Sequence, residues 1–112
     1  MAVIPRSFLR GDVCLIHLDP ARGSEIQKTR PCLVVSPDEL NQHLRTLIVA
    51  PMTTGVHEYP WRVACRFQNR SGFVAIDQLR TIDAERITKR LGRIHPNTMV
   101  SVLKILQEMF SL

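Results

Sequence analysis

Short apolar stretches separated by polar turns make up most of the chain, and one long amphipathic segment ends it. Apolar runs of about four to eight residues bounded by turn signals are typical of strands, whereas a period of about 3.6 residues indicates a helix. We therefore expect strands at 13–18, 30–35, 46–52, 61–67 and 72–77, and a weaker one at 87–94, where lysine and arginine interrupt the apolar pattern. The polar segment 68–71 predicts a turn.

Two helices are predicted. Ser36-Pro37-Asp38-Glu39 combines a capping box with a proline at the first helical position, so a short helix should run to about Leu44. A long helix should begin at Pro96, because apolar residues then recur at helical spacing: Met99, Val102, Leu103, Leu106, Met109 and Phe110. Val100 and Ile105 widen this face. Either the whole face packs on the strands of its own chain, or part of it forms a homodimer interface.

These elements predict a mainly β, α+β protein with five to seven antiparallel strands in a small, strongly bent sheet or barrel. A short helix is inserted between strands and another helix ends the chain. The length of 112 residues and the 45% hydrophobic content fit one globular domain over residues 1–112. No apolar run is long enough to cross a membrane, and segment 1–10 is too short and interrupted to be a secretory signal.

Cysteine usage and charge narrow the class of protein further. Cys14, Cys32 and Cys65 are odd in number and lie in apolar stretches, which favours buried, reduced thiols and a cytoplasmic location. The formal net charge of +5 suggests a polyanionic partner. A basic run without acidic residues, 86–93, either binds phosphates or is the solvated face of a strand. No cysteine or histidine pair has metal-ligand spacing, and the acidic residues near position 80 form no recognisable cluster, so no metal or other cofactor is predicted.

One pair of predicted strands suggests chemistry. A polar loop ending at Arg30 leads into one of them, and another ends at Thr53. If the two strands pair antiparallel with Leu33 opposite Val49, Arg30 lies across from Thr53 or Met52. A guanidinium offers a planar fork of donors that matches phosphate oxygens, and a threonine hydroxyl adds one more donor. This arrangement would suit a phosphodiester at one rim of the sheet.

A series of short motifs, in order along the chain, resembles the toxins of the MazF/PemK family. The motifs are Arg10-Gly11-Asp12-Val13, Asp19-Pro20, Gly23-Ser24-Glu25, Arg30-Pro31, Asn41, Pro51-Met52-Thr53-Thr54, Tyr59-Pro60 and Asp77-Gln78. The resemblance covers about residues 10–95, and the terminal helix is where the family has one. It implies an SH3-like barrel, a homodimer, and a metal-independent endoribonuclease that cuts single-stranded RNA at short sequences. It also implies a cognate acidic antitoxin, with operator DNA bound only through the toxin–antitoxin complex.

The resemblance assigns catalytic roles to Arg30 and Thr53. RNA carries its own nucleophile, the 2′-hydroxyl, so the protein must remove a proton, stabilise the charged phosphorane and protonate the leaving 5′-oxygen. Arg30 can stabilise that charge, and Thr53 can donate to the same oxygens, with Thr54 as its less favoured substitute. Neither is a good base, so Glu25 and His57 are the candidate bases. Further substrate contacts are expected from Ser24, Lys28, Thr54, His57, Tyr59, Trp61, Asp77 and Gln78.

Several alternatives stay open. Tyr59 and Trp61 can stack on an unpaired base, although core packing is the favoured position for Trp61. Some plasmid-borne members of the family carry histidine where this chain has Ser24 and arginine where it has Ala75, and these residues are credited with catalysis; here only Asp77 of that set remains, so Asp77 is either functional or structural. A gyrase-poisoning toxin on the same barrel, a non-catalytic RNA-binding barrel and a structural interaction domain are the competing functions. The gyrase poison ends in Trp-Gly-Ile, whereas this chain ends in Met-Phe-Ser-Leu.

Overall fold

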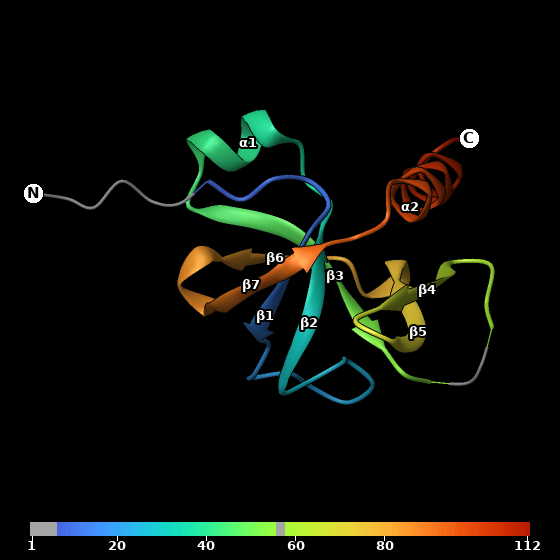
Figure 1. The fold of residues 1–112 in the computed structure, drawn as a ribbon, viewed down its shortest axis with the longest axis horizontal. Helices are drawn as coiled ribbons and strands as arrows, with labels where there is room; N and C mark the ends of the chain where they lie inside the picture. The colour runs from blue at the N-terminus through green and yellow to red at the C-terminus, as the bar shows by residue number, and fades with distance from the viewer. Residues whose placement is uncertain (1–6, 56–57) are drawn as a thin grey trace, which may run out of the picture.

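The computed structural model describes residues 7–55 and 58–112 (Figure 1). Within these ranges the chain forms two helices, α1 (Asp38–His43) between the second and third strands and α2 (Pro96–Met109) at the end. Short 3₁₀ turns at Ile76–Gln78 and Ala84–Arg86 flank the sixth strand. The strands are β1 (Asp12–His17), β2 (Thr29–Val34), β3 (Thr46–Thr53), β4 (Arg62–Phe67), β5 (Arg70–Ala75), β6 (Arg80–Asp83) and β7 (Ile87–Arg93).

The strands form one curled antiparallel sheet in the order β4-β5-β3-β2-β1-β7, and β6 pairs with β3. β3 changes its neighbour along its length, because residues 46–49 pair with β6 whereas Met52 and Thr53 pair with β5. This change bends the sheet into a small, partly closed SH3-like barrel (Figure 1). The predicted mainly β, α+β fold with a short inserted helix and a C-terminal helix is confirmed.

The register between β2 and β3 differs by one residue from the prediction. Leu33 pairs with Ala50, so the expectation that Leu33 lies opposite Val49 is wrong. Both faces of these strands are buried: Leu33 and Ala50 belong to one apolar cluster, and Val34 and Val49 belong to the other. An apolar pattern fixes the register only where one face of a strand is polar, so the sequence alone left this pairing ambiguous by one residue.

One strand was missed at the level of sequence, and one local prediction was wrong. Strand β6 was not predicted, because half of its four residues are charged and it is short. The capping box at Ser36 does not form, since the residue that caps α1 is Pro37 and no side chain bonds the first turn. The Ser36 hydroxyl is instead buried, where it contacts the Asn41 side chain and accepts a hydrogen bond of 3.1 Å from the Ile48 backbone N–H. Ser36 therefore joins α1 to β3.

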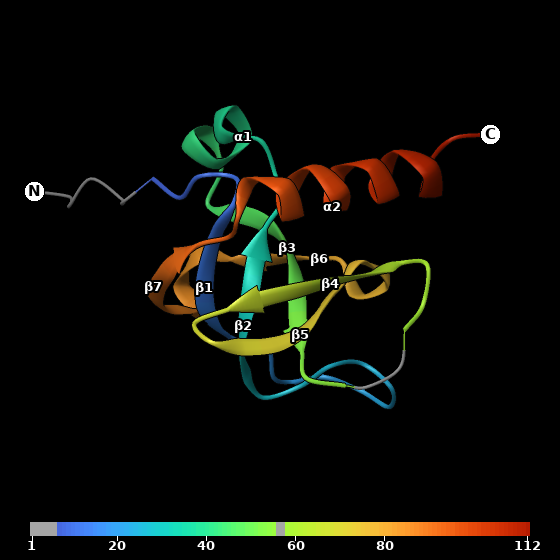
Figure 2. The same cartoon turned by 45° about the vertical axis from the view of Figure 1, so that its right-hand side comes forward.

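Helix α2 confirms the helix predicted from Pro96. Met99 and Val102 are buried in the cluster formed with β1, β2 and β5. Figure 2 shows α2 lying across one end of the strands, with its C-terminal turns extending beyond them. Leu103, Ile105 and Leu106 pack against the same cluster while remaining partly exposed, so the apolar face contacts its own chain as far as Leu106, and Met109 is exposed. Within the described ranges, neither helix combines the length and apolar composition needed to cross a membrane.

Candidate active site

A cavity of about 420 Å³ opens where β2, β3 and the β4–β5 hairpin meet. Arg30 from β2 and Thr53 at the end of β3 both line it, and we call it the Arg30–Thr53 cavity. The observed register, continued past the Cys32–Pro51 pair, places Arg30 level with Thr53 rather than Met52. None of the described residues that line the cavity is a carboxylate; they are Thr29, Arg30, Pro31, Met52, Thr53, Thr54, Cys65, Phe67, Gln68, Arg70, Ser71, Gly72 and Phe73.

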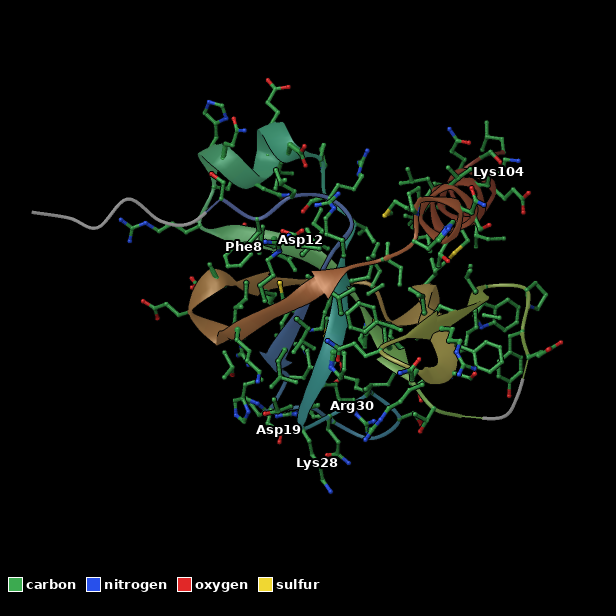
Figure 3. All side chains as sticks on the ribbon, viewed as in Figure 1. Phe8, Asp12, Asp19, Lys28, Arg30 and Lys104 are labelled. Atoms are coloured by element: carbon green, nitrogen blue, oxygen red, sulfur yellow. The ribbon has the colours of Figure 1, made fainter. Side chains whose placement is uncertain are left out.

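Arg30 is oriented by one backbone contact. Its Nε donates to the carbonyl oxygen of Gln27 at 2.9 Å, which fixes the side chain against the end of the preceding loop. Among the described residues, the two terminal nitrogens of the guanidinium have no hydrogen-bond partner. Figure 3 shows Arg30 and Lys28 together at one end of the sheet, beside the turn that holds Asp19. The unused donors of Arg30 are the pair that can grip two phosphate oxygens.

Thr53 is held from two directions. Its Oγ1 accepts a hydrogen bond of 3.2 Å from the backbone N–H of Gly55, so the hydroxyl proton remains available to donate. On the other side β5 approaches so closely that a Cβ atom at Gly72 would collide with the carbonyl oxygen of Thr53. Sequence reasoning missed Gly72, although a glycine inside a strand pattern is a signal of close backbone approach. Thr54 lines the same cavity.

Glu25 lies in a neighbouring hollow of about 480 Å³ rather than in the Arg30–Thr53 cavity. We call this the Glu25–Gln78 hollow; its walls are Ser24, Glu25, Ile26, Pro51, Asp77, Gln78, Leu79 and Arg80. Oε1 of Glu25 accepts a hydrogen bond of 2.6 Å from the backbone N–H of Arg22, which ties the carboxylate to its own loop. Ser24 and Glu25 thus line one hollow together, whereas Thr53, two residues after Pro51 on β3, lines the other cavity.

Gln78 contacts the loop between β1 and β2 through both ends of its side-chain amide. Its Oε1 accepts from the Ile26 backbone N–H at 3.1 Å, and its Nε2 donates to the Ser24 carbonyl oxygen at 3.2 Å. Both contacts join residues more than 50 positions apart in the sequence, so no local pattern predicts them. In this structure Gln78 positions the loop, and its hydrogen-bonding groups are engaged with protein.

Asp77 forms an ion pair with Arg62 of β4. The two Asp77 oxygens accept from Arg62 Nε at 3.0 Å and Nη2 at 3.1 Å, and this bidentate hydrogen bonding raises the pKa of the Arg62 guanidinium. The guanidinium carbon of Arg62 also lies 5.6 Å from the ring centroid of Tyr59. The sequence left Asp77 as either functional or structural, and the structure pairs its carboxylate with the guanidinium of Arg62.

Tyr59 and Trp61 stack on each other, with ring centroids 5.4 Å apart and ring planes 5° from parallel. Trp61 remains 40% exposed, so the expectation that it packs in the core is wrong. The reason is its position: Trp61 precedes β4, where the chain runs over the surface before the strand begins at Arg62. Neither ring lines the Arg30–Thr53 cavity. The candidate base His57 lies outside the described residues.

The basic run at 86–93 is largely committed to structure. Arg90 and Arg93 form ion pairs of 3.2 and 2.7 Å with Asp12, which is 1% exposed. Arg86 donates to the carbonyl oxygens of His17 and Asp19. From the sequence we considered this run either as a phosphate-binding site or as the solvated face of a strand. Both interpretations omitted the main role of these arginines, which is to hold β7 and the β1–β2 loop in place.

The other sequence predictions concern thiols, metals and the loop lysine. Cys14 and Cys32 are buried free thiols that lie opposite each other in the register of β1 and β2, whereas Cys65 is only partly buried. Burial raises the pKa of Cys14 to about 11 and that of Cys32 to about 12, so both thiols stay protonated and unreactive.

Lys28 is exposed, and its backbone N–H donates to Asp19 Oδ1 at 2.9 Å. Over residues 7–55 and 58–112, no group of three or more His, Cys, Asp or Glu residues is arranged to hold a metal ion.

Comparison with known proteins decides the family. The family described as "PemK-like, MazF-like toxin of type II toxin-antitoxin system" matches residues 9–110. The chain belongs to this family.

Its similarity to individual family members is consistent along most of the chain. It is 36% identical to Endoribonuclease PemK of Escherichia coli over 109 residues, covering 84% of this chain and 75% of the relative. It is 35% identical to Endoribonuclease toxin MazF of Escherichia coli K12 over 91 residues, covering 80% and 81%. The fold matches MazF of Deinococcus radiodurans with a TM-score of 0.85 at 24% identity, over 96% of this chain and 100% of that one. It also matches an endoribonuclease solved with its cognate antitoxin from a mycobacterial species, with a TM-score of 0.76 at 26% identity, over 89% and 91%.

Ala75 lies beside the ion pair between Asp77 and Arg62. Ala75 is fully buried in β5 and is paired with Arg62 in β4. A guanidinium cannot extend from position 75 here, but Arg62, directly opposite on the paired strand, brings one to Asp77. The carboxylate of Asp77 therefore has a guanidinium partner that comes from the neighbouring strand.

Proposed function

We propose that this PemK/MazF-family protein is the toxin of a type II toxin–antitoxin system and acts as a metal-independent endoribonuclease on single-stranded RNA. Relatives that are 35–36% identical over most of the chain are named endoribonucleases. The observation that carries the proposal is the Arg30–Thr53 cavity, in which a guanidinium and a hydroxyl share a wall without any carboxylate among the lining residues. That electrostatic environment favours a phosphodiester over a neutral or cationic ligand.

The reaction follows from the groups in this cavity. The RNA 2′-oxygen attacks the adjacent phosphorus, the 2′,3′-cyclic phosphate forms, and the bond to the 5′-oxygen breaks to leave a 5′-hydroxyl. The terminal nitrogens of Arg30 bind the non-bridging oxygens, where negative charge increases in the transition state. The Thr53 hydroxyl donates to the same oxygens while its own acceptor contact with the Gly55 N–H keeps it in place. The proton leaves the 2′-hydroxyl to a base and is returned to the 5′-oxygen.

Glu25 is the proposed base among the described residues, with His57 and water as alternatives. Glu25 lines the Glu25–Gln78 hollow together with Ser24 and does not line the Arg30–Thr53 cavity. The role therefore requires the loop between β1 and β2 to bring Glu25 toward the substrate, or the RNA to span both depressions. Along that path Ser24, Lys28 and Thr54 supply polar contacts, and the Tyr59–Trp61 stack offers a ring face to an unpaired base.

The proposal extends to partners. A homodimer would bury the end of α2, where Met109 and Phe110 continue the apolar face beyond the strands and are 44% and 76% exposed. A cognate antitoxin would cover the cavity with an acidic segment that orders on binding, as the basic, open rim favours. Operator DNA is bound only through that complex, and the toxin acts on messenger RNA in the cytoplasm, which inhibits translation and growth.

Cut-site mapping tests the proposal. Purified protein is incubated with a long single-stranded RNA of mixed sequence in excess EDTA, and the product ends are determined chemically. We expect cuts at a short recurring sequence, each with a 5′-hydroxyl and a 2′,3′-cyclic or 3′-phosphate. Cleavage that requires Mg²⁺, or products with a 5′-phosphate, would exclude this mechanism.

A further inference from the structure

The Arg30–Thr53 cavity contains a second guanidinium, from Arg70, that the sequence did not single out. Arg70 is the first residue of β5 and pairs with Phe67 across a tight turn. The turn residues Gln68 and Asn69 have positive φ angles of 50° and 63°, which is the two-residue geometry that keeps the paired strands of a hairpin in register. The hairpin therefore places Arg70 at a defined point, at the open end of β5.

Strand alternation explains why Arg70 lines the cavity. Residues 70, 72 and 74 lie on the same face of β5. Val74 on this face is buried in the core, and Gly72 has no side chain because β5 meets the Thr53 backbone there. The next residue on this face toward the open end is Arg70, which lies on the same face as its partner Phe67 and as Met52 and lines the cavity there.

Arg70 also differs from most other arginines of the chain in having no partner. Within residues 7–55 and 58–112, its guanidinium makes no hydrogen bond and no ion pair. By contrast, Arg62, Arg90 and Arg93 pair with carboxylates, and Arg80 and Arg86 donate to backbone carbonyls. Since the cavity wall holds no carboxylate, two cationic groups, Arg30 and Arg70, face one space with their terminal donors unused.

We propose that Arg70 binds a phosphate of the RNA adjacent to the phosphate that is cleaved. The inference rests on the proposed function, because Arg30 and Thr53 occupy the reacting phosphate and leave Arg70 for its neighbour. A single-stranded nucleic acid carries one phosphate per nucleotide, so a strand entering this cavity must bring a second anion past the hairpin. Arg70 thereby places the neighbouring phosphate of the strand at the open end of the β4–β5 hairpin.

The test compares Arg70→Ala with Arg66→Ala as a matched control. Arg66 lies on the same hairpin, and its substitution removes the same positive charge as that of Arg70. The Arg66 side chain, however, contacts Ser71 and does not line the Arg30–Thr53 cavity. The probe is a short RNA that contains a mapped cut site with a 2′-deoxy sugar at the attacking position, which prevents cleavage. We expect Arg70→Ala to weaken binding about tenfold, and to lower the slope of log affinity against log salt by about 0.7, the value for one phosphate contact on a single strand. Arg66→Ala should change neither quantity appreciably.

A neutral phosphate identifies the contact itself. The same RNA is made with a methylphosphonate at the position 5′ or 3′ to the scissile phosphate. At one of these positions the substitution should weaken binding by the parent protein, yet cause no further loss in Arg70→Ala, because the residue and the phosphate form one interaction. Equal effects of Arg70→Ala and Arg66→Ala, or additive losses at both positions, would overturn the inference.

The failure of this inference can be told apart from that of the proposed function. Cleavage of unmodified RNA by the parent protein is measured separately, in EDTA. If the parent cuts RNA and Arg70→Ala behaves like Arg66→Ala, only the role of Arg70 is wrong. If the parent binds but never cuts, and Arg70→Ala still shows the phosphate-specific loss, the contact stands and the endoribonuclease assignment is wrong.

Discussion

Backbone contacts on two sides fix the position of Thr53. Single residues that make these contacts therefore control the geometry of the site. The Gly55 N–H fixes its hydroxyl, and the missing side chain at Gly72 lets β5 pack against its carbonyl. Neither contact changes the chemistry of the hydroxyl. Both fix where it lies relative to Arg30, and misplacement of a reacting group by about 1 Å can cost about 10²-fold in rate.

We therefore predict that Gly72→Ala lowers the rate of RNA cleavage by about 10²-fold while the protein stays folded. The new Cβ would collide with backbone, so Thr53 must move. The measurement is single-turnover cleavage at saturating protein, with circular dichroism as the check on folding. Gly55→Ala is the control, because a Cβ there meets Thr53 Oγ1 at an ordinary 3.7 Å. A folded Gly72→Ala protein that cuts as fast as Gly55→Ala would show that the close approach is not what places Thr53.

The buried thiols predict a pH dependence of stability. Burial raises the pKa of Cys32 from 9.0 to about 12 and that of Cys14 to about 11. The folded state therefore holds protons that the unfolded state releases, so the free energy of unfolding is unaffected below pH 9 and falls above it. The slope is at most about 1.4 kcal/mol per pH unit for each thiol. Urea unfolding at pH 8 and pH 10 should show a smaller decrease for Cys32→Ala than for the parent; identical decreases would refute this cause.

At the scale of elements, the β1–β2 loop is held by residues distant in sequence. Gln78 bridges Ser24 and Ile26, and Arg86 bonds the carbonyl of Asp19 at the other end of the loop. These contacts keep a long polar connection in one arrangement, next to the strand that carries Arg30. The loop is thus part of the site through its anchors as well as through Glu25.

We predict that Gln78→Ala accelerates hydrogen exchange of the Ile26 amide and lowers RNA cleavage without unfolding the barrel. The amide loses its acceptor, and the loop loses both hydrogen bonds from the η1 turn (Ile76–Gln78). Gln107→Ala, an equivalent truncation on the exposed face of α2, is the control and should change neither quantity. Unaltered exchange at Ile26 in Gln78→Ala would mean that the loop is held by other contacts.

The sequence predicted the strands and the helix whose apolar patterns are strongly periodic. It failed to predict positions that are determined by contacts between residues far apart in sequence. The β3 strand and α2 follow from their apolar patterns, and Arg30 and Thr53 follow from pairing two strands, even with the register in error by one residue. The positions of Gly72 and Arg70 depend on β5 packing beside β3, which no local pattern encodes. Trp61 was misjudged because its size favours burial, whereas the chain at that point has not yet entered the sheet.

At the scale of the whole molecule, the end of α2 presents exposed apolar side chains. The C-terminal turns of α2 extend beyond the strands (Figure 2), and Met109 and Phe110 at the end of the helix are 44% and 76% exposed. We predict that Phe110→Asp converts a dimer into a monomer, as light scattering coupled to size exclusion would show, because burying a carboxylate in an apolar interface is costly. Val100→Asp is the control: Val100 is 52% exposed but lies in the first half of α2, ten residues before Phe110 and away from the helix end. A dimer that survives Phe110→Asp would place the interface elsewhere.

The most direct test of the account is the rate of RNA cleavage by Arg30→Ala in EDTA. The parent, Arg30→Ala and Arg66→Ala are compared on the same mapped RNA under single-turnover conditions, with thermal unfolding measured for each. We predict that Arg30→Ala unfolds like the parent and loses at least about 10²-fold in cleavage rate, while Arg66→Ala, with the same loss of charge, cuts nearly as fast as the parent. A folded Arg30→Ala protein that cuts at the parental rate would contradict the central claim, because the guanidinium in the carboxylate-free cavity would then have no part in the reaction.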